Sequence, residues 1–211
     1  MSERVPWVVG VSGASGTPYA RAVINGLLDA GCAVDLVVSR AARLTILDET
    51  GLSFRDSHWR DDLATWLSRD PHDTRYWSAG DLGAGPASGS YAVRGMVVVP
   101  ASTASVAGIA LGLSKDLLQR AADVTLKERR PLVVVPRETP YTRATLQHRL
   151  ALHDTGAVVL PASPGFYSAP ETVAQLVDFV AAKVLDVLDV PHDLIKRWTG
   201  TLGGARDAGD R

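Results

Sequence analysis

The stretch PWVVGVSGASGTP, residues 6–18, combines a buried strand, a glycine-rich turn and the start of a helix. Residues 6–11 are apolar without alternation, which is typical of a parallel strand covered on both faces. Gly13 and Gly16 let the backbone turn sharply and approach a ligand. The free N–H groups of the following helix then favour an anion such as phosphate. This stretch predicts an α/β sheet with a ligand at the carboxyl end of its first strand.

Four further Val-rich runs predict strands at 33–38, 95–99, 132–135 and 157–160. Between them, helical spacing covers 19–30, 102–123 and 142–152. The last helix is predicted to begin at a capping box formed by Ser168 and Glu171, with Pro170 in its first turn. This alternation predicts a single-domain, three-layer open parallel sheet of the Rossmann or flavodoxin-like type.

The domain is expected to span residues 1–198, with 199–211 as a flexible tail rich in glycine and charge. The stretch 69–90 is too long for a plain connection, so it is either mobile or part of a site. No other division of the chain is indicated, because neither a repeat nor a linker separates blocks of different composition.

The composition excludes several classes of function. The chain of 211 residues carries 22 Lys and Arg against 23 Asp and Glu, so its charge gives no reason to expect nucleic acid as a partner. No uncharged apolar run is long enough to span a membrane. Cys32 is the only cysteine, which excludes an internal disulfide and indicates the reducing cytoplasm. His148 and His153 are five residues apart, so they are not expected to bind a metal ion together.

The glycine spacing narrows the ligand. It reads G-x-x-G-x-x-G rather than the G-x-G-x-x-G of a dinucleotide site, and the second strand ends at Ser39-Arg40 without a carboxylate for a ribose. The P-loop pattern is also missing. A mononucleotide such as FMN fits better, although a tight turn with nothing bound is the simpler alternative.

The ends of three other predicted strands carry hydroxyl, charged or aromatic residues that are candidates for ligand binding. The run Ser102 to Ser105 can cap a helix or hold a ligand. Arg137 and Glu138 are enclosed by Pro136 and Pro140, which prevent an ordinary helix start. Residues 164–167, PGFY, place an aromatic ring and a phenol hydroxyl at the same edge. Ligands bind at this edge in open α/β sheets.

Together these motifs resemble those of the UbiX/Pad-type flavin prenyltransferases, which are flavodoxin-like proteins related to FMN-dependent cysteine decarboxylases. The resemblance runs from about residue 5 to 198. The matching words are G-A-S-G at 13–16, P-A-S-G-S at 86–90, R-A-A-D-V-x-L-K-E-R-R-P-L at 120–132, V-P-R-E-x-P at 135–140, P-G-F-Y at 164–167 and R-W at 197–198.

The resemblance implies a metal-independent enzyme. Members of this family join a dimethylallyl group from dimethylallyl phosphate to N5 and C6 of reduced FMN, which is a substrate rather than a redox cofactor. A UbiD-type decarboxylase then receives the prenylated FMN. Members are homo-oligomers, often dodecamers, with active sites at subunit contacts, so we expect the same assembly here.

The resemblance also assigns residues by their match to the family words. Ser15 corresponds to a hydroxyl near the reacting flavin, and Glu49 and Glu138 to the carboxylates that handle protons. The prenyl phosphate is expected at Arg120, Lys127, Tyr167 and Lys183, with Trp198 beside the prenyl group. The FMN contacts are expected at Gly13, Ala14, Ser15, Ser39, Ser102, Thr103, Ala104, Ser105 and Arg137.

Several of these residues have plainer interpretations. Lys127 begins a charge run of the kind that usually faces solvent, and Glu49 fits an exposed helix carboxylate. Tyr167 and Trp198 fit packing roles. Lys183 stands where many members have arginine, which removes a bidentate grip on phosphate. Residues 52–85 match only loosely and are assigned no site.

Three other functions remain open. An FMN-dependent decarboxylase of the cysteine type carries a P-x-M-N word and a catalytic histidine, where this chain has V-P-R-E-T-P. A non-catalytic flavin carrier would leave the expected convergence of Lys127, Tyr167 and Lys183 without a purpose. An enzyme that decarboxylates aromatic acids by itself would need no UbiD-type partner.

Overall fold

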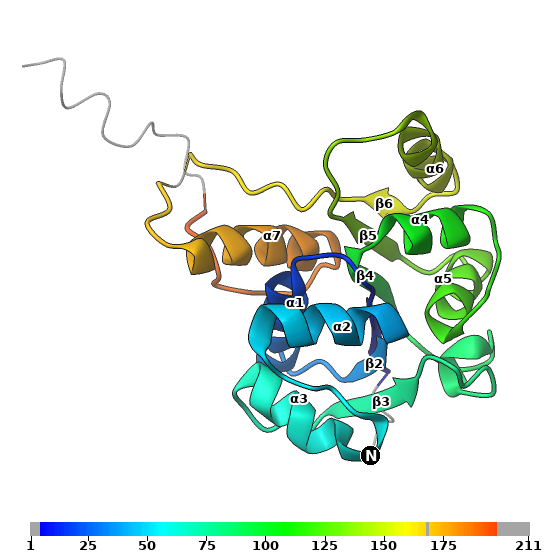
Figure 1. The fold of residues 1–211 in the computed structure, drawn as a ribbon, viewed down its shortest axis with the longest axis horizontal. Coiled ribbons are helices and arrows are strands. Elements are labelled where there is room, and N and C mark those ends of the chain that lie inside the picture. Colours follow the sequence, from blue (N-terminus) through cyan, green and yellow to red (C-terminus); the bar gives the residue numbers. More distant parts are fainter. Residues whose placement is uncertain (1–4, 168, 198–211) are drawn as a thin grey trace, which may run out of the picture.

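The computed structural model describes residues 5–167 and 169–197 and shows a doubly wound parallel sheet (Figure 1). Within these residues, six strands lie in the order β3-β2-β1-β4-β5-β6, and every neighbouring pair is parallel. The strands are β1 Trp7–Val11, β2 Val34–Val38, β3 Thr74–Ser78, β4 Gly95–Ala101, β5 Leu132–Pro136 and β6 Val158–Val159.

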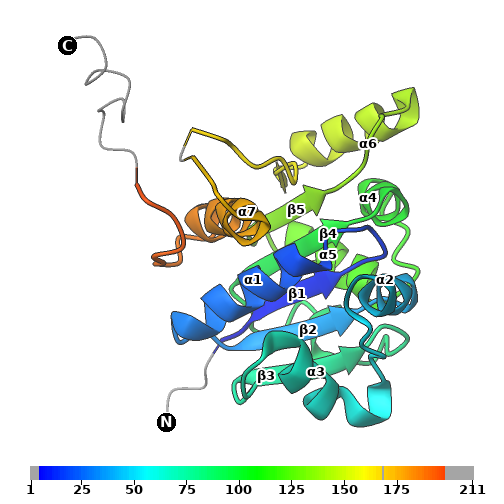
Figure 2. The ribbon, with the colours of Figure 1, turned by 60° about the vertical axis from the view of Figure 1, so that its left-hand side comes forward.

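Helices cover both faces of the sheet, as expected for three layers (Figure 2). Val9, Leu36 and Val97 face a core that includes buried residues of α1, α2, α3 and α7. Val8 and Val98 face the opposite core, with α4, α5 and α6. The helices are α1 Thr17–Asp29, α2 Arg40–Thr50, α3 Trp59–Leu67, α4 Thr103–Ala110, α5 Leu117–Lys127, α6 Arg143–Asp154 and α7 Val173–Val187, with short 3-10 helices at Asp56–His58 and Gly85–Ala87.

The direction of winding reverses between β1 and β4. From β1 the chain adds β2 and β3 on one side, and it then crosses back to place β4, β5 and β6 on the other. Loops leave the carboxyl ends of β1 and β4 in opposite directions. This reversal is the point where open α/β sheets bind ligands.

The strand β3 occupies part of the stretch 69–90, which therefore contains a strand that was not predicted. Thr74–Ser78 pairs with β2 along its whole length at the edge of the sheet, and four of its five residues are only partly buried or exposed. The sequence TRYWS lacks the valine run that marks the other strands. An edge strand does not need that run, because it is less covered than a central strand.

Two helix predictions are wrong in their boundaries. The predicted helix 102–123 is two helices, and the break contains Gly112 and Ser114 at positive φ angles of 62° and 48°. The last helix begins at Val173, where Thr172 and Gln175 form the capping box. Pro170 and Glu171 precede that helix, and Ser168 lies outside the described residues. None of the helices in residues 5–167 and 169–197 has the length and apolar character to cross a membrane.

Candidate functional site

Ser12 joins the two strand ends at the reversal point. Its buried hydroxyl donates to the carbonyl oxygen of Pro100 at 2.9 Å and accepts from the N–H of Ser102 at 2.7 Å. These bonds fix the loops after β1 and β4 against each other. Ser12 is not among the site residues predicted from the sequence. The sequence does contain a signal for this role, since Ser12 is a polar residue that directly follows an otherwise apolar strand.

The glycine loop turns tightly against α2. A Cβ on Gly13 would overlap Ala41, so only glycine permits this approach. Ala14 is buried and Ser15 is exposed. The Ser15 carbonyl oxygen accepts from Arg137 Nε at 3.1 Å. The structure therefore brings together the first and third strand ends that the sequence singled out.

Glu49 occupies the N-terminus of α1, where the sequence predicted N–H groups free for a phosphate. Its carboxylate accepts from the N–H groups of Gly16 and Thr17, both at 2.8 Å, and from the Thr17 hydroxyl at 2.6 Å. Partial burial alone would raise the pKa of Glu49. Hydrogen bonds from the Thr17 and Ser15 hydroxyls and from the two N–H groups outweigh burial and hold its pKa below the usual value. A phosphate cannot use these two N–H groups while Glu49 holds them.

The predicted hydroxyl contacts are helix caps. Ser39 Oγ accepts from the N–H of Ala42 at 3.1 Å, and Ser102 Oγ accepts from the N–H of Ser105 at 3.2 Å. Each bond satisfies a backbone donor at the start of a helix. Thr103 and Ala104, which lie between Ser102 and Ser105, line a cavity instead.

Glu138 lies between two cavities at the carboxyl edge. One, of about 300 Å³, is lined by residues 136–141 with Ala162 and Ser163. The other, of about 410 Å³, lies between α4 and α6 and includes Thr103 and His148. Glu138 Oε1 accepts from the N–H of Thr139 at 2.9 Å. The fold thus places a carboxylate where groups bound on either side can reach it. It also brings His148 to the second cavity, a residue that the sequence patterns did not assign to the site.

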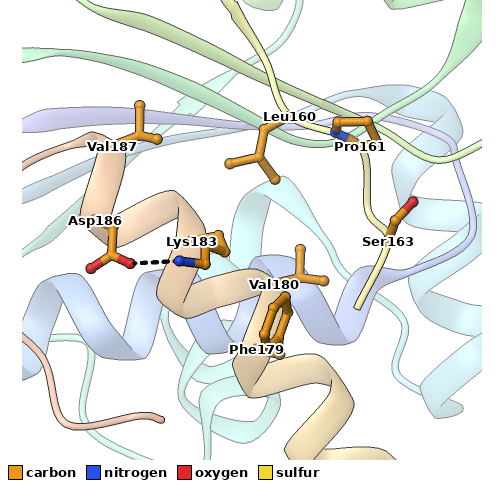
Figure 3. Close-up of a pocket in the computed structure, with 8 residues that line it drawn as sticks. All are labelled: Leu160, Pro161, Ser163, Phe179, Val180, Lys183, Asp186 and Val187. Atoms are coloured by element: carbon orange, nitrogen blue, oxygen red, sulfur yellow. Dashed lines mark hydrogen bonds and ion pairs between the residues drawn. The ribbon is translucent and has the colours of Figure 1, made fainter. Parts of the chain in front are cut away.

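A third cavity, of about 420 Å³, adjoins the first through Ser163, which lines both. Lys183 and Asp186 line it from α7, opposite Leu160 and Pro161, as Figure 3 shows. The Lys183 ammonium lies 3.4 Å from Asp186 Oδ2. Tyr167 packs edge-on against Phe179 with ring centroids 5.6 Å apart, and Phe179 lines the same cavity. Tyr167 and Lys183 therefore belong to one region.

Comparisons with known proteins agree with this geometry. The model of the Flavoprotein family matches residues 1–192. A flavin prenyltransferase UbiX from Streptomyces coelicolor is 63% identical, over 97% of this chain and 100% of that protein. The chain belongs to the UbiX flavin prenyltransferase family.

Two crystal structures of UbiX-type proteins have the same fold. AnUbiX (PadA1), in complex with FMN and dimethylallyl pyrophosphate, is 32% identical with a TM-score of 0.82, over 94% of this chain and 100% of that chain. A dodecameric FMN-dependent UbiX-like decarboxylase from Escherichia coli O157:H7 is 37% identical with a TM-score of 0.82, over 93% and 100%. The predicted fold class and the predicted family are both confirmed.

Within one chain, Lys127 lies away from Glu138 and the carboxyl edge of the sheet, so its expected meeting with Tyr167 and Lys183 stays a prediction about subunit contacts. The helix α5 starts beside Ala79, just after β3, and ends at Lys127, just before β5 begins. It therefore runs from the carboxyl edge of the sheet to the amino edge, about 16 Å away at 1.5 Å per residue. Lys127 pairs there with Glu128.

Arg120 lies along the same helix. Its Nε donates to the carbonyl oxygen of Ala87 at 3.2 Å and its Nη1 pairs with Asp123 at 2.9 Å. The predicted phosphate residues thus form two groups, one on α5 and one beside α7. Trp198 and the predicted tail lie outside the described residues, so the structure places neither.

The residues at the reversal point fit FMN. Arg137 supplies a guanidinium for a phosphate, and the cavities on both sides of Glu138 supply room beside capped helix N-termini. In residues 5–167 and 169–197, no group of three or more His, Cys, Asp or Glu is arranged to hold a metal ion.

Proposed function

We propose that this chain is a flavin prenyltransferase that joins a dimethylallyl group, taken from dimethylallyl phosphate, to N5 and C6 of reduced FMN. The observation that carries the proposal is the contiguous edge of the sheet. There Arg137 and Glu138 border one cavity, and Lys183 borders the next, with Ser163 between them. The full-length identity of 63% to a protein named for this activity supports it.

The reaction breaks the C–O bond of the donor and releases inorganic phosphate. One C–N bond forms at N5, whose proton leaves with the phosphate, and one C–C bond forms at C6, which loses a proton while the double bond of the dimethylallyl group is consumed by taking one up. Reduced FMN supplies the nucleophile when bound. The protein has to hold the flavin and donor together, stabilise the departing phosphate and accept a proton. Apolar walls such as Leu160 and Phe179 would exclude water from the cavity. This exclusion matters because water would capture an allylic cation.

Arg137 is proposed to hold the FMN phosphate, and the loop Gly13–Ser15 with the run Ser102 to Ser105 to frame the flavin. Ser39 supports this edge by capping α2. Lys183 and Tyr167 are proposed to bind the donor phosphate, because a lysine and a phenol hydroxyl both donate to developing negative charge. Arg120 and Lys127 would complete that site from a neighbouring subunit, and Trp198 would lie beside the prenyl group.

The two carboxylates have different proposed roles. Glu138 borders two cavities, so it is placed to take the proton from C6. Glu49 is held ionised at the start of α1, and the neighbouring Ser15 side chain helps to keep its pKa low. We therefore assign Glu49 to orienting Ser15 beside the flavin, with proton transfer at N5 passing through the Ser15 hydroxyl.

The product would pass to a UbiD-type decarboxylase, since prenylated FMN is useful only to an enzyme that binds it. We propose a homo-oligomer, with the dodecamer of the Escherichia coli relative as the expected form. The proposed location is the reducing cytoplasm, because the reaction consumes reduced flavin and the single cysteine, Cys32, is a free thiol.

The test is an anaerobic incubation of the purified protein with reduced FMN and dimethylallyl monophosphate, followed by mass analysis of the flavin. A gain of one five-carbon prenyl unit is expected. Glu138→Gln and Lys127→Ala should each slow the reaction about 100-fold or more. Glu171→Gln and Lys115→Ala are matched controls on exposed residues and should keep the wild-type rate.

Unchanged FMN that nevertheless binds tightly would refute the transferase. The Escherichia coli relative is called a decarboxylase, so that activity is the second candidate. Release of carbon dioxide from cysteine-terminal peptides or aromatic acids, without a UbiD-type partner, would then identify it.

A further inference from the structure

Asp186 is the centre of a charge cluster at the C-terminal end of α7. Its Oδ1 accepts from Arg197 Nη1 at 2.5 Å and lies 3.1 Å from His192 Nε2. Its Oδ2 lies 3.4 Å from the Lys183 ammonium. The His192 side chain is 2% exposed, so it is fixed in place, and its Nδ1 accepts from the N–H of Leu194 at 3.3 Å. One carboxylate thus links α7 to the segment 192–197.

The two oxygens of Asp186 are used unequally. Oδ1 has two close partners from the C-terminal segment, which hold the carboxylate, whereas Oδ2 faces Lys183 inside the cavity. Partial burial would raise the pKa of Asp186, but the hydrogen bonds from Arg197 and His192 outweigh burial and keep it low. An ionised, fixed acceptor is therefore available to one ammonium with three donors.

We infer that Asp186 is a positioning residue that holds the Lys183 ammonium at the wall of this cavity, ready for the phosphate of the prenyl donor. The inference rests on the proposed function, which makes Lys183 a donor-phosphate contact. Lysine lacks the rigid fork of arginine and loses rotamer freedom when it is fixed. A neighbouring acceptor reduces that loss before the donor binds.

The alternative is that Asp186 repels the phosphate, since both are anions and both would lie in one cavity. The geometry opposes this alternative. Two side-chain cations, Lys183 and Arg197, face the single carboxylate, so the cluster is net positive even with His192 neutral. The charge of Asp186 is already compensated at Oδ1, where no donor phosphate would sit. The two alternatives predict opposite signs for the same substitution.

The experiment compares full-length wild type and Asp186→Asn. Asparagine keeps one oxygen for Arg197 and His192 but loses the charge that holds Lys183. The expected result is a rise of about three- to fivefold in KM and in the calorimetric Kd for dimethylallyl monophosphate, the range of a half-exposed ion pair. The kcat and the Kd for FMN should stay within about twofold. Asp189→Asn, an exposed neighbour, should change nothing.

A double-mutant cycle separates positioning from general structural damage. In a Lys183→Gln background, Asp186→Asn should no longer alter donor Kd, because the side chain that it acts through is gone. Asp186→Glu, which keeps the charge, should restore at least part of the affinity. A lower KM in Asp186→Asn, an unchanged KM, or an equal effect in both backgrounds would each overturn the inference.

The binding measurement also separates this inference from the proposed function. If wild type binds the donor but forms no prenylated FMN, the transferase is refuted, while the cycle on Kd still decides the role of Asp186. If wild type does not bind dimethylallyl monophosphate at all, both fail.

Discussion

The carboxyl edge of the sheet and the helix α5 both carry cations that are proposed to bind phosphate, but their surroundings differ. At the carboxyl edge, Ser12 joins two strand ends, Arg137 binds the glycine loop and adjoining cavities flank Glu138. At the far end of α5, Lys127 pairs with Glu128, and Arg120 in the first turn of the same helix pairs with Asp123. The proposed site, which needs both regions, would therefore be made by two subunits.

The strongest test of that comparison is complementation between inactive variants. Lys127→Ala removes the far end and Glu138→Gln removes the carboxyl edge, so each homo-oligomer should be inactive. In mixed oligomers formed by co-expression, about a quarter of the sites should contain both wild-type residues and regain activity. The rate of flavin prenylation in the mixture measures this fraction. A mixture as inactive as its components would show that one chain supplies both residues.

A smaller effect is expected at Glu49, which belongs to the carboxyl edge. Glu49→Gln should lower the free energy of unfolding by about 1–2 kcal/mol at neutral pH, because it weakens charged hydrogen bonds at a helix N-terminus. The folded pKa of Glu49 is lowered, so its contribution is present above the ordinary value and is lost as pH falls through the lowered one. Urea unfolding at fixed protein concentration should therefore show wild type and variant converging in acid. A difference that stays constant with pH would contradict this account.

The smallest effect is expected in the loop of residues 86–91, which lies beside α5. Buried Asp35 accepts from Tyr91 OH and Trp77 Nε1, both at 2.9 Å, and Arg130 Nη1 donates to the Tyr91 carbonyl oxygen at 3.0 Å. Burial raises the pKa of Asp35 more than these hydrogen bonds lower it. Tyr91→Phe should cost about 1 kcal/mol of stability.

Hydrogen exchange should locate that loss. Faster exchange is expected in residues 86–91, with the carboxyl edge unchanged and FMN binding intact. Faster exchange at 13–16 instead would mean that the two regions are not independent, and the comparison would have to be abandoned.

The sequence predicted the central strands well because each is covered on both faces. Such strands must be continuously apolar, and Val8, Val9, Val97 and Val98 show this pattern directly. The edge strand Thr74–Ser78 was not predicted, because an edge strand does not have to be continuously apolar. The break in 102–123 was missed for a related reason, because two apolar helices joined by a short turn have nearly the composition of one.

The sequence motifs indicated which residues are candidates for the site, and the fold determined which of them lie close together. The sequence by itself determined the α/β class and the family, because local patterns and long motifs carry those properties. Only the tertiary structure decided that Glu49 fills the N-terminus of α1, that Glu138 borders two cavities and that Lys127 lies at the opposite edge of the sheet from Glu138. Those facts depend on the packing of segments distant in the chain, and no local pattern encodes the distance between them.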